Sequence, residues 1–307
     1  MPLVKVNAAG SRPAAGDLAA LEAALARVPR EAPVVICVHG YRFCPDSLAH
    51  TPHGHILSLD PVRADPRAVS WPRGLGFTGE TPEEGVCVAL GWSARGSIWQ
   101  AAARARPTAE ALARVIRRID RPVHLLAHSL GARVALGALP ALPAGAVGRI
   151  ILLAGAEFRA AARLAMTSEA GRTAEVFNVT SRENALYELL FQAALLGAQG
   201  PARTLGAGLG GTLPNWCDLP IDATATRDAL ARMGFPVPAP DRRVCHWSPY
   251  LRAGLFELYR AMLRSPEALP AGLLARAVPQ TRPSRRARVF PGPSRALPLS
   301  FSRKASS

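Results

Sequence analysis

One serine stands between a buried-strand pattern and a helix pattern, and this junction constrains the fold more than any other feature of the chain. Residues 123–127 form a mainly apolar run that is long enough for one parallel strand buried on both faces. Residues 131–139 have the composition of a helix, which Pro140 ends. Ser129 lies in the turn between them, with a small residue two positions away on either side. Such a turn strains the backbone of the serine and lifts its side chain above the edge of the sheet.

The segment around this serine, Ala127-His-Ser-Leu-Gly131, resembles the nucleophile elbow of the α/β-hydrolase family, with Ala127 in place of the usual first glycine. The resemblance implies that Ser129 is a nucleophile and that two backbone N–H groups form an oxyanion hole. One N–H belongs to Leu130, and the other belongs to Tyr41, which follows an apolar run and a His-Gly pair. The alternative is an ordinary strand followed by a Ser-Leu-Gly turn.

The alternation of apolar runs and helix patterns predicts an α/β fold, with a mostly parallel sheet covered by helices on both faces. Further strands are predicted in residues 33–38, 86–92, 148–155 and 175–181. One of the intervening helices is predicted to begin at Pro107 or Thr108. Ligands bind beyond the carboxyl ends of the strands of such a sheet, and His39 and Ser129 both fall at these ends.

A serine hydroxyl needs a neighbouring base to become a nucleophile, and His246 is the predicted base. It is the only one of the seven histidines that lies C-terminal to the serine, and the resemblance implies the order serine, acid, histidine. The resemblance also places the acid on the turn after the strand predicted at 175–181, where no aspartate occurs. Glu183 is the first candidate for the acid, and Asp218 and Asn184 remain alternatives.

Composition argues against several other classes of protein. The chain has 307 residues, of which 49% are hydrophobic, so it can bury a full core. Residues 265–307 carry +7 of its formal charge of +15, and the remaining +8 is spread along the first 264 residues rather than clustered, so nucleic-acid binding is not predicted. No apolar run approaches the roughly 20 residues that span a bilayer, and the N-terminus lacks the pattern of a secretory signal. Five cysteines without a Cys-x-x-Cys pair argue against a disulfide framework and favour the cytoplasm.

The predicted organisation is one α/β-hydrolase-like domain over residues 1–264 and a flexible basic tail over residues 265–307, which is rich in proline, serine and arginine. Residues 186–245 are predicted to leave the sheet as a lid or loop. Within them, residues 206–211 match Gly-x-Gly-x-x-Gly, but no predicted strand precedes them, so a dinucleotide site is not expected.

No metal and no other cofactor is predicted. His50, His53 and His55 lie close together in the sequence, but they lack a carboxylate at ligand spacing, and Pro52 and Gly54 interrupt any regular placement. A surface loop with a short helix is the preferred interpretation of this segment.

These residues together predict a serine hydrolase that cleaves an ester, thioester or amide bond of a small-molecule substrate through an acyl-enzyme on Ser129. The alternative is a hydrolase fold without catalytic activity, which acts by binding a partner. The missing aspartate after Ser181 favours that alternative.

Overall fold

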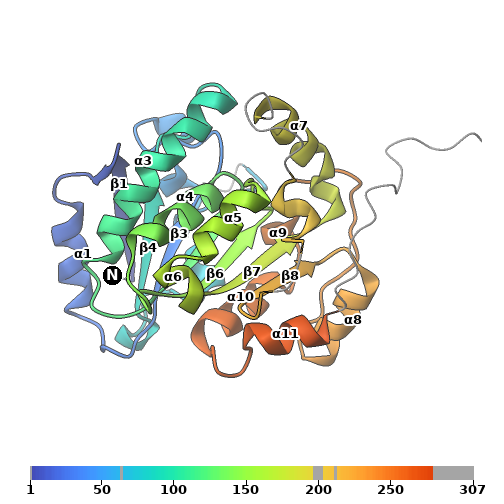
Figure 1. The fold of residues 1–307 in the computed structure, drawn as a ribbon. Helices are drawn as coiled ribbons and strands as arrows, with labels where there is room; N and C mark the ends of the chain where they lie inside the picture. The colour runs from blue at the N-terminus through green and yellow to red at the C-terminus, as the bar shows by residue number, and fades with distance from the viewer. Residues whose placement is uncertain (1, 63–64, 196–202, 211–212, 279–307) are drawn as a thin grey trace, which may run out of the picture.

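The computed structural model describes residues 2–62, 65–195, 203–210 and 213–278 (Figure 1). Their main feature is an eight-stranded sheet with the order β2-β1-β4-β3-β5-β6-β7-β8. The short β2 pairs antiparallel with β1, and all the other neighbouring strands pair parallel. The strands are β1 (Leu3–Ala9), β2 (Arg12–Pro13), β3 (Val34–Val38), β4 (Val86–Gly91), β5 (Val123–His128), β6 (Val147–Leu153), β7 (Glu175–Thr180) and β8 (Trp216–Pro220).

Helices cover both faces of the sheet. They are α1 (Asp17–Leu25), α2 (Trp71–Gly74), α3 (Ile98–Ile116), α4 (Gly131–Ala138), α5 (Arg159–Met166), α6 (Glu169–Thr173), α7 (Ala185–Leu195), α8 (Thr224–Arg232), α9 (Ser248–Leu251), α10 (Leu255–Arg264) and α11 (Ala271–Ala277). Apolar residues of α1 and of α3 to α7 pack on one face, and those of α2 and of α8 to α11 pack on the other. Figure 1 shows α3, α4 and α5 in front of the strands. The predicted fold class, an α/β fold with a mostly parallel sheet covered by helices on both faces, is confirmed.

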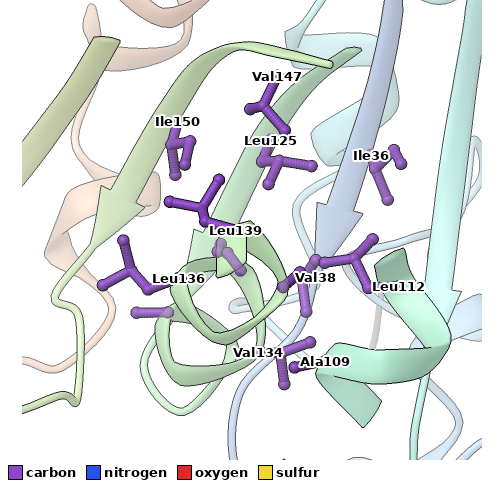
Figure 2. Packing of buried hydrophobic residues seen from close by; sticks show 14 of the residues in the cluster. Ile36, Val38, Ala109, Leu112, Leu125, Val134, Leu136, Leu139, Val147 and Ile150 are labelled. Carbon is purple, nitrogen blue, oxygen red and sulfur yellow. The ribbon is translucent and has the colours of Figure 1, made fainter. Parts of the chain in front are cut away.

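The strands β3 and β4 have no polar side chain because both of their faces are buried. In β3, Val34, Ile36 and Val38 face one core, whereas Val35 and Cys37 face the other. Side chains of α3 and α4 fill the first core against β3, β5 and β6, as Figure 2 shows. This packing fixes the carboxyl end of β5, and with it the position of Ser129.

The helix predicted to begin at Pro107 or Thr108 instead begins at Ile98, so that prediction of its start is wrong. The Ser97 hydroxyl accepts a hydrogen bond from the backbone N–H of Gln100, and the Gln100 side chain accepts one from the N–H of Ser97. This capping box starts the helix, and Pro107 lies inside it.

Residues 186–245, predicted to leave the sheet, include its last strand, since β8 pairs parallel with β7. Residues 196–202 and 211–212 of this segment lie outside the described part of the chain.

The first residues of the segment predicted as a tail form α11, and the side chain of Leu274 in this helix is fully buried. The backbone N–H of Ala271 donates to Glu175 Oε1 at 2.8 Å, which ties the start of α11 to β7. Residues 279–307 lie outside the described part of the chain. Within the described part, no helix is long and apolar enough to cross a bilayer.

Candidate functional site

Ser129 occupies the sharp turn between β5 and α4 and has a φ of 54°, in the left-handed region that residues other than glycine rarely adopt. Backbone hydrogen bonds hold it there. Its N–H donates to Leu153 O at 3.0 Å, and its carbonyl accepts from Ala132 N–H at 3.0 Å and from Ala156 N–H at 2.9 Å. The turn is therefore fixed by β6 and by the segment that follows it, as a strained functional conformation requires.

The turn after β3 lies directly against Ser129. A Cβ atom at Gly40 would lie 2.7 Å from Ser129 Cβ and 2.9 Å from His128 O, so only glycine fits without displacement. The next residue is Tyr41, and Leu130 follows the serine. Among the described residues, the backbone N–H groups of Tyr41 and Leu130 donate to no protein acceptor.

His39 supports this turn. Its Nδ1 lies 2.9 Å from Gly40 O, and its Nε2 lies 3.0 Å from the backbone nitrogen of Trp92. A carbonyl on one side and an N–H on the other assign the neutral ring with the proton on Nδ1. Burial lowers the pKa of His39 to about 3, which agrees with that neutral form.

His246 contacts Asn184, which lies just beyond the end of β7. The distance from His246 Nδ1 to Asn184 Oδ1 is 2.6 Å. The Asn184 Nδ2 group donates to Glu188 Oε1 at 3.1 Å, which assigns the amide orientation and leaves its oxygen for the imidazole. His246 Nδ1 therefore carries a proton, and Nε2 is the nitrogen free to accept one.

Glu183, the first candidate for the acid, does not contact His246. Its carboxylate is buried, forms an ion pair with Arg252 and accepts a hydrogen bond from the Ser181 hydroxyl at 2.9 Å. Its backbone carbonyl accepts from the N–H of Cys245 at 2.9 Å. Glu183 thus anchors the loop that carries His246, while its neighbour Asn184 contacts the ring. The assignment of Glu183 as the partner of the imidazole is corrected to Asn184.

Asp218, the second candidate for the acid, also has other partners. Its carboxylate accepts hydrogen bonds from Asn178 Nδ2 at 2.8 Å, from Trp216 Nε1 at 2.9 Å and from the N–H of Leu209 at 2.9 Å. These bonds join β7, β8 and the loop before β8. Asp218 is therefore a structural residue of the sheet edge.

Aromatic rings enclose His246. The Tyr187 ring stacks on it at a centroid distance of 4.7 Å, and the His128 ring lies 4.6 Å away. His128 Nε2 lies 3.1 Å from His246 O and donates to it. Burial and the nearby His128 lower the pKa of His246 well below its ordinary value, and burial lowers that of His128 to about 4.

Ser129 and His246 come to the same end of the sheet, because His128 precedes the serine and contacts the His246 ring and backbone. In the described part of the chain, no hydrogen bond joins the Ser129 hydroxyl to His246. Catalytic hydrogen bonds are often long in the absence of substrate and shorten in the substrate complex.

The three clustered histidines do not converge. His53 Nε2 lies 2.7 Å from Asn7 Oδ1, whereas His55 Nε2 lies 3.2 Å from Asp65 Oδ2. Within the described residues, no group of three or more His, Cys, Asp or Glu side chains is placed to hold a metal ion.

Sequence reasoning missed three residues around the site: Glu188, Tyr187 and Arg252. Glu188 lies four residues after Asn184, a spacing that puts both side chains on one face of a helix that starts there, so this signal was available. Arg252 lies far from Glu183 in the sequence, and nothing in the sequence links the two.

Comparison with known proteins adds little at the level of sequence. No protein-family model and no curated protein matches the chain. Among solved structures, a lipase-esterase related protein from Clostridium acetobutylicum is similar at 10% sequence identity over 54% of this chain and 83% of that chain, with a TM-score of 0.29. The fold described above therefore rests on the strand order and on the turn at Ser129.

Proposed function

We propose that this protein is a serine hydrolase whose catalytic residues are Ser129, His246 and Asn184. The observation that carries the proposal is the 2.6 Å contact of His246 Nδ1 with Asn184 Oδ1, at the end of the sheet where Ser129 has its left-handed conformation. This contact leaves Nε2 as the basic nitrogen. Asparagine orients the ring without offsetting its charge when it is protonated.

The reaction is acyl transfer to water. Ser129 Oγ attacks the carbonyl carbon of an ester, thioester or amide while its proton passes to His246 Nε2, and the N–H groups of Tyr41 and Leu130 bind the oxyanion. The imidazolium then gives its proton to the leaving group as the bond to the acyl carbon breaks. A water molecule then attacks the acyl carbon while its proton passes to His246 Nε2, and the imidazolium returns a proton to Ser129 Oγ as the bond from Oγ to the acyl carbon breaks. No cofactor takes part in these steps.

Glu188 supports this assignment, because its carboxylate accepts a hydrogen bond from the Asn184 amide. An aspartate would supply a negative charge next to the imidazole. Here that charge is on Glu188, which is linked to the imidazole through Asn184. It still favours the imidazolium that forms during the reaction, although less than a direct contact would. We place the enzyme in the reducing cytoplasm, since Cys37, Cys44, Cys87, Cys217 and Cys245 are all free thiols.

The test is labelling with a fluorophosphonate, which reacts with activated serines. The wild-type protein is expected to be labelled, Ser129→Ala to lose the label completely, and His246→Ala to react at least about a hundredfold more slowly. Ser93→Ala is the matched control, since Ser93 follows β4 at the same end of the sheet. Labelling that survives in Ser129→Ala, or no labelling of the wild type, would contradict the proposal.

The alternative, a hydrolase fold that binds a partner without catalysis, is favoured by one specific observation. No hydrogen bond joins the Ser129 hydroxyl to His246 in the described residues. A folded wild-type protein that neither takes the label nor cleaves para-nitrophenyl esters would favour this alternative.

A further inference from the structure

A cationic cavity lies beside the turn that carries the proposed oxyanion donor. Its volume is about 420 Å³, and its lining residues are Tyr41, Arg42, His50, Arg95 and Gly96. They come from the loop after β3, a short helical turn, and the loop after β4. Two of the five are arginines and none is acidic, so the electrostatic potential in the cavity favours an anion.

Neither arginine is neutralised by a carboxylate within the described residues. The contacts they do make are weak. Arg42 lies 5.9 Å from the centre of the Tyr41 ring, and Arg95 Nη1 lies 3.4 Å from the Ser47 hydroxyl. By contrast, the half-buried Arg133 makes two hydrogen bonds to Glu157, at 2.8 and 2.9 Å. The guanidinium groups at the cavity thus keep their capacity to bind an anion.

The loop that carries Arg42 is held in one conformation. Arg42 has a φ of 78°, which costs energy for a residue with a side chain. Its N–H donates to Ala94 O at 2.9 Å, and the Ala94 N–H donates to Phe43 O at 2.9 Å. The Tyr41 hydroxyl donates to Gly96 O at 2.6 Å. These bonds join the two loops, so the cavity is built before any ligand arrives.

The cavity shares Tyr41 with the proposed oxyanion hole. Gly40 packs against Ser129, and Tyr41 contributes both its proposed oxyanion N–H and a wall of the cavity. A substrate whose carbonyl binds at Ser129 can therefore place another of its groups in this cavity.

We infer that this cavity is the subsite for an anionic group of the substrate, a carboxylate or a phosphate. The inference rests on the proposed function, because it assigns a substrate class to the proposed hydrolase: an ester that carries a negative charge near its scissile bond. Guanidinium groups bind both oxyanions in the same bidentate manner, so the shared chemistry is a planar or tetrahedral oxyanion.

The first experiment compares two esters of equal length. Mono-para-nitrophenyl glutarate carries a terminal carboxylate where para-nitrophenyl valerate carries a methyl group. Wild type is expected to prefer the glutarate ester in kcat/KM, and Arg42→Gln/Arg95→Gln is expected to lower kcat/KM for that ester alone by about ten- to a hundredfold. Arg27→Gln, an exposed arginine at the end of α1, is the matched control and is expected to change neither rate.

The second experiment measures binding without catalysis. Ser129→Ala is titrated with glutarate and, separately, with inorganic phosphate in a calorimeter at low salt, where exposed charges are least screened. Binding of either anion that Arg42→Gln/Arg95→Gln abolishes supports the inference, and the anion that binds more tightly identifies the source of the charge.

The two proposals fail differently. Equal kcat/KM for the two esters together with no anion binding would overturn the subsite and leave the hydrolase standing. Anion binding that depends on Arg42 and Arg95, in a wild type that cleaves neither ester, would overturn the hydrolase and uphold the anion site.

Discussion

Moving the negative charge of Glu188 to position 184 tests the proposed role of the residues behind His246. In Asn184→Asp/Glu188→Gln the net charge is unchanged, and the glutamine amide can donate to the new aspartate as Asn184 now donates to Glu188. The His246 Nδ1–H keeps an acceptor at the position where Asn184 Oδ1 lies 2.6 Å away. Only the distance between the carboxylate and the imidazole changes.

The expected effect follows from Coulomb's law. Two unit charges about 4 Å apart interact with about 4 kcal/mol at an effective dielectric constant of about 20, and the interaction halves when the distance doubles. The double substitution roughly halves the separation of carboxylate and imidazole, so the electrostatic stabilisation of the imidazolium increases by about 2 kcal/mol. That gain corresponds to a rise of about 1.5 units in the pKa of His246.

The assay is kcat/KM for a neutral para-nitrophenyl ester as a function of pH. In the wild type, burial and His128 hold the pKa of His246 well below its ordinary value, so the base stays unprotonated and activity persists into acidic solution. The double variant is expected to lose activity at a pH about 1 to 2 units higher, and Glu188→Gln alone to lose it at a lower pH. Glu257→Gln, an exposed residue of α10, is the control for general electrostatic effects.

The reasoning would be refuted if the double variant lost activity at the same pH as the wild type or at a lower pH, while unfolding at the wild-type temperature. It would mean that the Asn184 amide is not the partner of the imidazole in the proposed reaction, whatever the resting contact between them.

Two further predictions concern the turn and the core. Gly40→Ala is expected to lower kcat by at least about a hundredfold, because its Cβ would lie 2.7 Å from Ser129 Cβ and displace the oxyanion N–H, and a rate within threefold of wild type would contradict this. Leu274→Ala is expected to lower the free energy of unfolding by about 2–5 kcal/mol in urea denaturation, since this side chain of α11 is 0% exposed. Its neighbour Leu273, 38% exposed, is the control, and an equal loss in Leu273→Ala would show that α11 does not dock as described.

The elements that hold Ser129 were predictable because their hydrophobic pattern is local. β5 and α4 are read from consecutive residues, and four of the six residues of the strand are buried apolar ones despite His124 and His128. β8 was hidden because Asp218 and Pro220 are unusual in a strand. The carboxylate is tolerated there because three hydrogen bonds satisfy it, one from β7, one from the loop before β8 and one from Trp216 of the same strand.

The partner of His246 was predictable to within one residue and no closer. Glu183 and Asn184 are consecutive in a short helical turn, so their side chains point in different directions. Which of them faces the imidazole depends on Arg252, whose guanidinium takes the Glu183 carboxylate. That partner lies far along the chain, and ion pairing between such distant positions leaves no periodic signal in a single sequence.

The bond between the Cys245 N–H and the Glu183 carbonyl has a consequence for motion. It ties the loop that carries His246 to the turn that supplies Asn184. The imidazole and its amide partner therefore move together when either segment fluctuates. The distance that thermal motion can change is then the one between this pair and Ser129, and in the proposed mechanism the frequency of their close approach sets how often the serine is ready to react.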